Sequence, residues 1–406
     1  MGCGCPSCLD ISAVDFSRYT RIIDRIAKAL HGKKISPEDL DQEFISQTYN
    51  ELAEGASAGY GKKFDAFPKD GKGTTPLFLK RNIYAFSGAK SYAVLKQLND
   101  LLVDQDGKLR PYNEFQQMAR KVNENFNKNY LQAEYQTART AAQMAEKWER
   151  LQETKDLFPN LKFRTVGDDR VRDDHEKLNG IIKPIDDAFW DRYYPPLDWR
   201  CRCDVVATAE DADENEPEDM PPIKFKGNVG KDKEIFTKKG SFFQLLRTEK
   251  NAVRNAEISK LVAPSDIVYR KKGKKLDVSI YAHEVDLEDN IKVGAALIES
   301  GYNVSVRAHL DGMIVKGVKN PEYLINNKIA ERKTPEGKNY NNILIKANKQ
   351  GCEIVVIDLS KNKDSIEDAL LKINNILRFP VHNNIKEVIV VSGKISKVYK
   401  RKKQPK

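Results

Sequence analysis

The stretch Asn320-Pro-Glu-Tyr-Leu-Ile-Asn-Asn-Lys-Ile-Ala-Glu-Arg-Lys333 decides the fold of the last third of the chain. Its centre, Asn326-Asn327, tolerates the left-handed backbone conformation that a two-residue hairpin turn requires. Apolar residues flank this pair on both sides, as expected of two short strands. We therefore predict an antiparallel hairpin with the pairs Ile325–Lys328, Leu324–Ile329 and Tyr323–Ala330.

The same register places charged side chains together on one face of the hairpin. Glu322 is expected opposite Glu331, and Lys333 follows two residues later on the same side of its strand. Two facing carboxylates repel each other, and a bridging divalent metal ion would remove that conflict. A neighbouring ammonium group can stabilise charge during phosphodiester cleavage. The alternative is a solvent-facing strand pair with lysine contacts and no chemistry.

Helices and strands alternate around the hairpin, which indicates an α/β domain that begins near residue 266. The strand at 386–393 is expected to be the last one. The expected helices cover residues 284–300, 341–350 and 365–377, and the other expected strands cover 303–310 and 352–359.

This region resembles the PD-(D/E)XK nuclease superfamily, with Glu322 where aspartate is usual. More narrowly, residues 266–398 resemble the tRNA nuclease domain at the C-terminus of CdiA contact-dependent inhibition toxins. The matching elements are His283-Glu284, the strand with Gly-Tyr-Asn-Val, the hairpin stretch as far as Pro335, the helix ending Lys-Ala-Asn-Lys-Gln-Gly and the strand with Ile-Val-Val-Ile-Asp-Leu.

The resemblance implies a metal-dependent endoribonuclease that acts on tRNA, with Glu322, Glu331 and Lys333 in the catalytic positions. Glu322 and Glu331 would hold one divalent ion, Mg²⁺ or Zn²⁺, and Glu284 would contribute a further acid. The alternative for Glu284 is an ordinary acid near a helix N-terminus, where the helix dipole favours it. Gln350 either approaches the site from the next helix or simply ends that helix. A cognate immunity protein is the partner that such a toxin implies.

The N-terminal part of the chain is predicted to be helical, because residues 12–154 repeat apolar side chains at three- and four-residue spacing. The run 112–153 lacks Gly and Pro, so we expect one or two long amphipathic helices in a bundle or a self-association element. From Pro159 onward, aromatic residues, prolines and paired charges predict a small irregular α+β module.

This module resembles the phage Mu F-like head morphogenesis family. The resemblance extends over about residues 1–240 and implies a minor capsid protein that acts with the portal in prohead assembly. The residues that carry it are Asp168, Arg170-Val171-Arg172, His175, Gly180, Trp190, Pro195-Pro196, Trp199 and Cys201-Arg202-Cys203.

His175, Cys201 and Cys203 are candidate zinc ligands, because imidazole and thiolate are the groups that zinc prefers. Cys201 and Cys203 are predicted to alternate on a strand, so both thiols are expected to face the same way. No fourth ligand is evident from the sequence. The alternative is a pair of reduced, packed thiols among arginine–aspartate ion pairs.

Charge and composition limit the classes of function. The chain has 69 basic residues (Lys plus Arg) and 59 acidic residues (Asp plus Glu). Residues 266–406 contain 27 of the basic and 17 of the acidic residues, so the rest of the chain contains 42 basic and 42 acidic residues. A basic excess confined to the last third is typical of a segment that binds nucleic acid, although a solubilising tail at 400–406 would also add to it.

The N-terminus and the overall composition predict a protein outside the membrane. The sequence has no stretch with the length and apolarity of a spanning helix and begins without a signal-peptide pattern. Six cysteines in 406 residues do not form a disulfide scaffold, and Cys3, Cys5 and Cys8 stay unassigned. We expect the chain in the bacterial host cytoplasm during assembly and then inside the capsid.

These observations predict a head morphogenesis domain at 1–240, a polar helical linker at 241–265 and a nuclease domain at 266–406. The predicted protein is a phage or prophage minor head protein that carries a metal-dependent nuclease toxin. One alternative is a purely structural capsid protein whose basic domain binds DNA or the portal without catalysis. Another is a DNase, since a metal–carboxylate site can cleave either nucleic-acid backbone.

Overall fold

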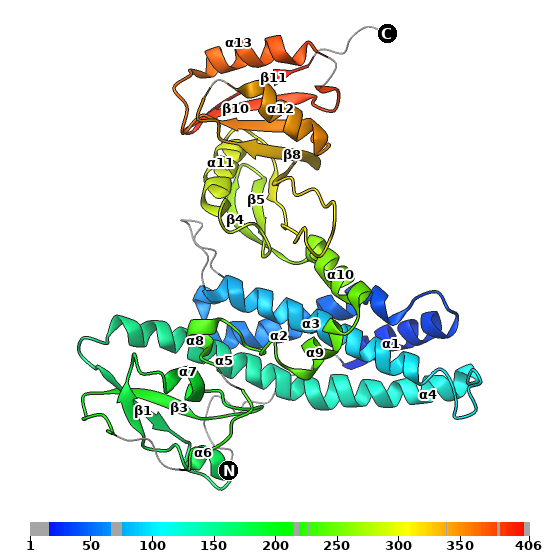
Figure 1. Cartoon of the computed structure of the whole chain (residues 1–406), viewed down its shortest axis with the longest axis vertical. Coiled ribbons are helices and arrows are strands. Elements are labelled where there is room, and N and C mark those ends of the chain that lie inside the picture. The colour runs from blue at the N-terminus through cyan, green and yellow to red at the C-terminus, as the bar shows by residue number, and fades with distance from the viewer. Residues whose placement is uncertain are drawn as a thin grey trace. The chain divides into compact units, whose positions relative to one another are not determined.

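The computed structural model describes residues 16–65, 75–214, 219–225, 227–337, 339–379 and 382–401. They form two compact units. The chain passes from the first unit to the second between residues 256 and 257, inside helix α10 (Lys250–Ser259). The first unit is mainly helical and the second contains a large sheet (Figure 1), so the predicted multidomain organisation is confirmed. The domain limits at 240 and 265 stay predictions. Cys3, Cys5, Cys8 and the basic residues after Arg401 lie outside the described residues.

Long helices dominate the first unit. A π-helical segment, Glu124–Tyr130, joins α4 to α5, so the helical run predicted for 112–153 is confirmed and contains one irregular stretch. Helices α2 and α5 pack so closely at Gly59 that a Cβ atom there would lie 1.9 Å from the carbonyl oxygen of Arg139. The long helices are α1 (Phe16–His31), α2 (Gln42–Tyr60), α3 (Thr75–Asp100), α4 (Tyr112–Asn123) and α5 (Leu131–Glu153).

Shorter helices connect these elements. The predicted linker 241–265 is largely helical, yet its first helix is part of the first unit's core, because Phe243 is buried and its ring lies 6.2 Å from that of Phe86 on α3. No helix in the described part of the chain is long and apolar enough to cross a membrane. The short helices are α6 (Asp173–Glu176), α7 (Trp190–Tyr193), α8 (Val229–Asp232), α9 (Ser241–Arg247) and the 3-10 turns Pro37–Asp39, Lys62–Phe64 and Lys260–Val262.

A small antiparallel sheet forms the irregular module predicted after Pro159. Its strands β1 (Asn160–Arg164), β2 (Ile182–Pro184) and β3 (Asp204–Thr208) pair in the order β2-β1-β3. The prediction that Cys201 and Cys203 lie on a strand is wrong, because β3 begins one residue after Cys203.

The second unit is built on a mixed sheet of eight strands in the order β11-β10-β9-β8-β7-β6-β5-β4. Strands β8, β9 and β10 run parallel to one another, and the β7–β8 hairpin is antiparallel. The prediction that 386–393 is the last strand is wrong, since β11 follows it. The strands are β4 (Ser265–Lys271), β5 (Lys274–Ser279), β6 (Val304–Val306), β7 (Tyr323–Ile325), β8 (Lys328–Lys333), β9 (Ile354–Asp358), β10 (Glu387–Ser392) and β11 (Ile395–Lys400).

Helices cover both faces of this sheet. On one face, α12 (Tyr340–Lys349) and α13 (Ile366–Leu377) pack in a buried apolar cluster with Val355 of β9 and Val390 of β10. On the other face lies α11 (Leu287–Glu299), whose Gly294 allows the side chain of Leu276 on β5 to approach closely. Strand residues alternate between these two environments, and this alternation positions the charged side chains of β8.

Candidate functional site

The β7–β8 hairpin has the predicted turn and register. Asn326 and Asn327 have φ values of 46° and 64°, so both adopt the left-handed conformation that the turn requires. The pairs Tyr323–Ala330, Leu324–Ile329 and Ile325–Lys328 all form as predicted.

Glu331 and Lys333 lie on the face that α12 and α13 cover. Glu331 pairs with Val355 across the β8–β9 ladder and Lys333 pairs with Ile357, and both of these partners belong to the apolar cluster under the two helices. The Glu331 side chain is 2% exposed, and its Oε1 atom forms an ion pair with the Lys333 ammonium group. Burial alone would lower the pKa of Lys333, but the carboxylates of Glu331, Glu322 and Asp286 outweigh it and raise that pKa.

Glu322 lies one residue before β7 and extends its pairing. Its carbonyl oxygen accepts a hydrogen bond of 2.8 Å from the backbone N–H of Arg307. Its side chain is 15% exposed. Burial raises the pKa of the Glu322 carboxyl to about 7; Arg332 opposes this rise and Glu331 adds to it. Glu322 and Glu331 therefore influence each other electrostatically.

Arg332 is the residue of this site that the sequence analysis missed. It points to the α11 face of the sheet, where its Nε atom donates a hydrogen bond of 2.7 Å to Asn290 Oδ1. Its side chain is only 5% exposed. Carboxylate oxygens surround its guanidinium group at 3.6 to 3.8 Å. They belong to Asp286, Asp289, Glu322 and Asp358.

Glu331 and Glu322 thus each lie beside a cation. Lys333 contacts Glu331, and Arg332 lies 3.6 Å from Glu322. The carboxylate repulsion inferred from the sequence is therefore relieved in part without a metal ion. No sequence signal identified Arg332. Strand alternation places it on the face of the sheet opposite Glu331, and the predicted site was defined by the face that carries Glu331 and Lys333.

Unsatisfied oxygen atoms suit this site to a hard cation. Glu322 Oε2, Glu331 Oε2 and Gln350 Oε1 are buried and accept no hydrogen bond from any residue that the structure describes. Gln350 follows α12, which packs on the same face of the sheet as Glu331. Buried polar atoms without partners are rare and energetically unfavourable. Carboxylate and amide oxygens are also ligands that Mg²⁺ accepts, so the chemistry of these three atoms suits a divalent ion.

Glu284 lies before the helix, because α11 begins at Leu287 and not at Glu284 as predicted. Its side chain is exposed. The acids at this helix start that approach the hairpin are Asp286 and Asp289, both through Arg332. A catalytic role for Glu284 stays a prediction.

The raised pKa of Glu322 predicts a pH-dependent effect of Glu322→Gln in the metal-free protein. Below about pH 4.5 the Glu322 carboxyl is neutral in both the folded and the unfolded states, so its burial does not lower the free energy of unfolding. As the pH rises through about 7, this stability is lost, because the carboxyl ionises less readily in the folded state than in the unfolded state. Because Gln stays neutral, Glu322→Gln should raise the free energy of unfolding by roughly 3 kcal/mol at pH 8. At pH 4.5 its effect should be small. Urea unfolding with chelator present measures both values, and an equal effect at both pH values contradicts the burial argument.

The predicted zinc ligands form a compact cluster in the first unit. His175 Nδ1 lies 3.7 Å from Cys201 Sγ and 3.5 Å from Cys203 Sγ, and all three side chains are buried. A hydrogen bond from the Cys203 thiol is the largest influence that lowers the pKa of Cys201, and the pKa of Cys203 rises correspondingly. The expected ion pairs form in part: Arg202 binds Asp168 through two contacts of 2.6 and 2.7 Å.

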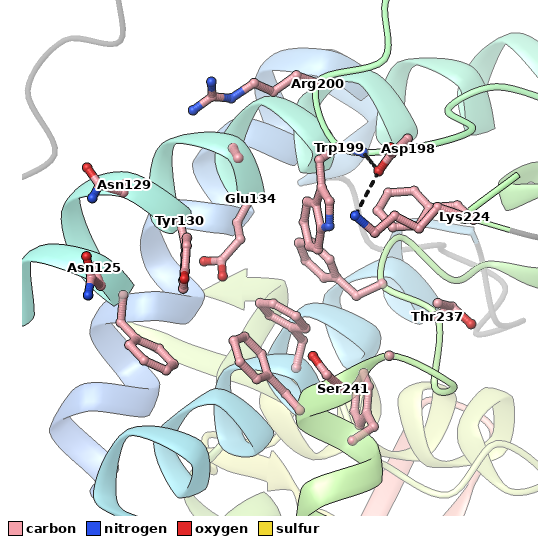
Figure 2. A pocket seen from close by; sticks show the side chains of 18 of the residues that line it. Asn125, Asn129, Tyr130, Glu134, Asp198, Trp199, Arg200, Lys224, Thr237 and Ser241 are labelled. Atoms are coloured by element: carbon pink, nitrogen blue, oxygen red, sulfur yellow. Dashed lines mark hydrogen bonds and ion pairs between the residues drawn. The ribbon is translucent and has the colours of Figure 1, made fainter. Parts of the chain in front are cut away.

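The first unit also has a cavity of about 920 Å³, and Arg200, the residue before Cys201, is part of its lining (Figure 2). Aromatic rings from distant parts of the chain line it, including those of Phe126, Trp199 and Phe236. Glu134 also lines the cavity and forms a fully buried pair with Lys90, which donates a second hydrogen bond to the carbonyl oxygen of Phe126 in the π-helical segment. No pattern in the sequence predicted this cavity.

Two family models match separate parts of the chain. Residues 109–206 match the model described as Phage Mu protein F like protein. Residues 319–395 match the model of the contact-dependent growth inhibition CdiA C-terminal domain. The chain therefore joins a segment similar to Mu F proteins to a segment similar to CdiA C-terminal domains, and the resemblance predicted for each is confirmed.

Curated relatives match the first of these segments. "Putative capsid assembly protein F" of Escherichia phage Mu is 38% identical over 63 residues, which cover 16% of this chain and 14% of that protein. "Mu-like prophage FluMu F protein" of Haemophilus influenzae is 41% identical over 76 residues, which cover 19% of this chain and 16% of that protein. The chain thus spans less than a fifth of the length of either relative.

Among solved structures, the "CdiA-CT/CdiI toxin and immunity complex from Burkholderia pseudomallei" is similar to part of this chain. It has 22% sequence identity and a TM-score of 0.24, and the match covers 29% of this chain and 86% of that chain.

Proposed function

We propose that the chain is a minor head protein of a phage or prophage whose C-terminal unit is a metal-dependent nuclease toxin of the PD-(D/E)XK type, acting on tRNA. The observation that carries the proposal is the pair of buried carboxylate oxygens, on Glu322 and Glu331, that have no hydrogen-bond partner among the described residues. The other oxygen of Glu331 forms an ion pair with Lys333. The match of residues 319–395 to CdiA C-terminal domains supports the same class of protein.

Glu322 and Glu331 would hold the divalent ion, with Gln350 as a candidate neutral ligand. When bound, a divalent ion supplies Lewis-acid polarisation of the scissile phosphate. Lys333 would stabilise the charge that develops on the phosphate oxygens, because its ammonium group is a donor and cannot be a ligand. Arg332 would hold the Glu322 carboxylate in position from the other face of the sheet. The basic excess of residues 266–406 would attract the nucleic-acid backbone.

The Mu F-like segment supports a role in the capsid, with portal and capsid proteins as partners. A nuclease made in its own host cytoplasm also requires a neutralising protein, so we propose a cognate immunity protein. The solved Burkholderia complex holds a toxin together with such a protein.

A second candidate function is nucleic-acid binding without cleavage. It is favoured by one observation: Lys333 and Arg332 lie beside the two carboxylates and compensate part of their charge. In that case the C-terminal unit would bind DNA or the portal during packaging, in a purely structural protein.

A cleavage assay of the full chain separates these functions. Radiolabelled tRNA and duplex DNA are each incubated with Mg²⁺, with Zn²⁺ or with chelator. Metal-dependent cleavage of tRNA supports the proposal, whereas cleavage of duplex DNA alone identifies a DNase. Binding of either nucleic acid without cleavage under all conditions favours the structural role.

A further inference from the structure

The His175–Cys201–Cys203 cluster has the geometry of a metal site as well as its ligand types. Typical zinc bonds of about 2.3 Å to sulfur and 2.0–2.1 Å to nitrogen place the two ligand atoms about 3.6 Å apart at a tetrahedral angle. The observed nitrogen–sulfur distances are 3.5 and 3.7 Å. The three ligand atoms all lie within 4.8 Å of one another. Both nitrogen–sulfur distances therefore match those of a tetrahedral zinc site.

The surroundings hold this cluster in place from several directions. His175 lies on α6, and the backbone N–H of Leu197 donates a hydrogen bond to the Cys201 sulfur. Hydrogen bonds of this kind orient and stabilise thiolate ligands. The Arg202–Asp168 ion pair fixes the residue between the two cysteines. No disulfide joins Cys201 to Cys203, since both are free thiols.

We propose that His175, Cys201 and Cys203 bind one Zn²⁺ ion that fastens α6 to the loop before β3. In the described part of the chain, the group contains no fourth carboxylate, thiol or imidazole. The fourth coordination position is therefore assigned to a water molecule. This site is separate from the carboxylate site of the second unit, and the proposal does not depend on the nuclease function.

The structural role of the ion follows from the loop that it fastens. Asp198, Trp199 and Arg200 lie between Leu197 and Cys201 and form one wall of the aromatic cavity (Figure 2). Arg172, just before α6, donates a hydrogen bond of 2.9 Å to the carbonyl oxygen of Trp199. An ion bound to α6 and to Cys201 would hold the same two segments together and so fix the cavity wall.

Metal analysis of the full chain tests the proposal. Protein purified without added metal should contain about one zinc ion per chain. The double variant Cys201→Ser/Cys203→Ser should contain almost none, whereas Cys352→Ala, which removes a buried free cysteine of the second unit, should retain the ion. Glu331→Gln should also retain it, which separates this ion from any ion at the carboxylate site.

Cobalt substitution covers the case in which the double variant fails to fold. The unmodified chain loaded with Co²⁺ should show thiolate-to-cobalt charge-transfer absorption, and that absorption should persist in Cys352→Ala. Chelation should lower the melting temperature of the first unit and leave cleavage by the metal-reloaded carboxylate site unchanged. The proposal is overturned if the zinc content is far below one ion per chain even after zinc is supplied, or if it is the same in the double variant.

Discussion

Glu331→Gln is expected to abolish nucleic-acid cleavage while the second unit stays folded. The change makes a charged ligand group neutral at a position where one carboxylate oxygen, Oε2, has no hydrogen-bond partner among the described residues. Loss of a charged ligand or of transition-state stabilisation should reduce the cleavage rate by roughly 100-fold or more. The free energy of unfolding without metal should change by no more than about 1 kcal/mol, the scale of cross-strand pair effects.

Lys333→Met is the companion variant that separates chemistry from metal binding. It should abolish cleavage but retain most of the affinity for the divalent ion, because an ammonium group stabilises substrate charge and is not a ligand. Cleavage rate, metal affinity by calorimetry and melting temperature are measured for both variants. Cleavage at the normal rate by Glu331→Gln would refute the catalytic assignment.

Arg332→Met is expected to destabilise the second unit strongly. The guanidinium group is buried among the carboxylates of Asp286, Asp289, Glu322 and Asp358. Removal of one partner from a buried charge cluster leaves the others uncompensated, and such changes lower the free energy of unfolding by about 3–5 kcal/mol.

Urea unfolding at neutral pH measures this loss, with Lys328→Met as the matched control because Lys328 lies on the same strand and is exposed. The control should change the free energy of unfolding by less than about 0.5 kcal/mol. The loss for Arg332→Met should shrink as the pH falls below about 7, the raised pKa of Glu322, because the protonated Glu322 carboxyl needs no cation. A loss as small as that of the control would show that the cluster is not held by Arg332.

The hairpin was predictable from the sequence because its determinants are local. Asn326 and Asn327 favour the left-handed turn, and the two-residue period of strands then fixes every pair on both sides. The helices and apolar strands that follow carry similarly local patterns. Strands β4, β5 and β11 were missed because they are rich in charged residues and only partly buried.

The surroundings of the candidate site were not predictable in the same way. Asp286, Asp289 and Asp358 reach Arg332 only because α11 covers one face of the sheet and β9 pairs with β8. Nothing in the spacing of these residues along the chain indicates this. The aromatic cavity of the first unit has the same origin. Its rings come from segments as distant as Phe86 and Phe236, which stack with centroids 3.8 Å apart.

The sequence identified the residues of the cysteine cluster correctly, but it did not predict the backbone conformation around them. Cys201 and Cys203 were expected on a strand, but they precede β3 in an irregular segment. Their thiols still approach the His175 ring. Ligand identity could therefore be read from composition, whereas the geometry depends on tertiary packing.

The two outermost strands of the large sheet have a consequence for aggregation. Strands β4 and β11 end the sheet and leave backbone groups open to a strand from another molecule. β4 carries Arg270 and Lys271, and β11 carries Lys397 and Lys400. Pairing of two such edges would bring cations together, which opposes the growth of intermolecular sheets. The basic excess of this unit thus also helps to keep the protein dispersed when many copies are crowded into a small volume.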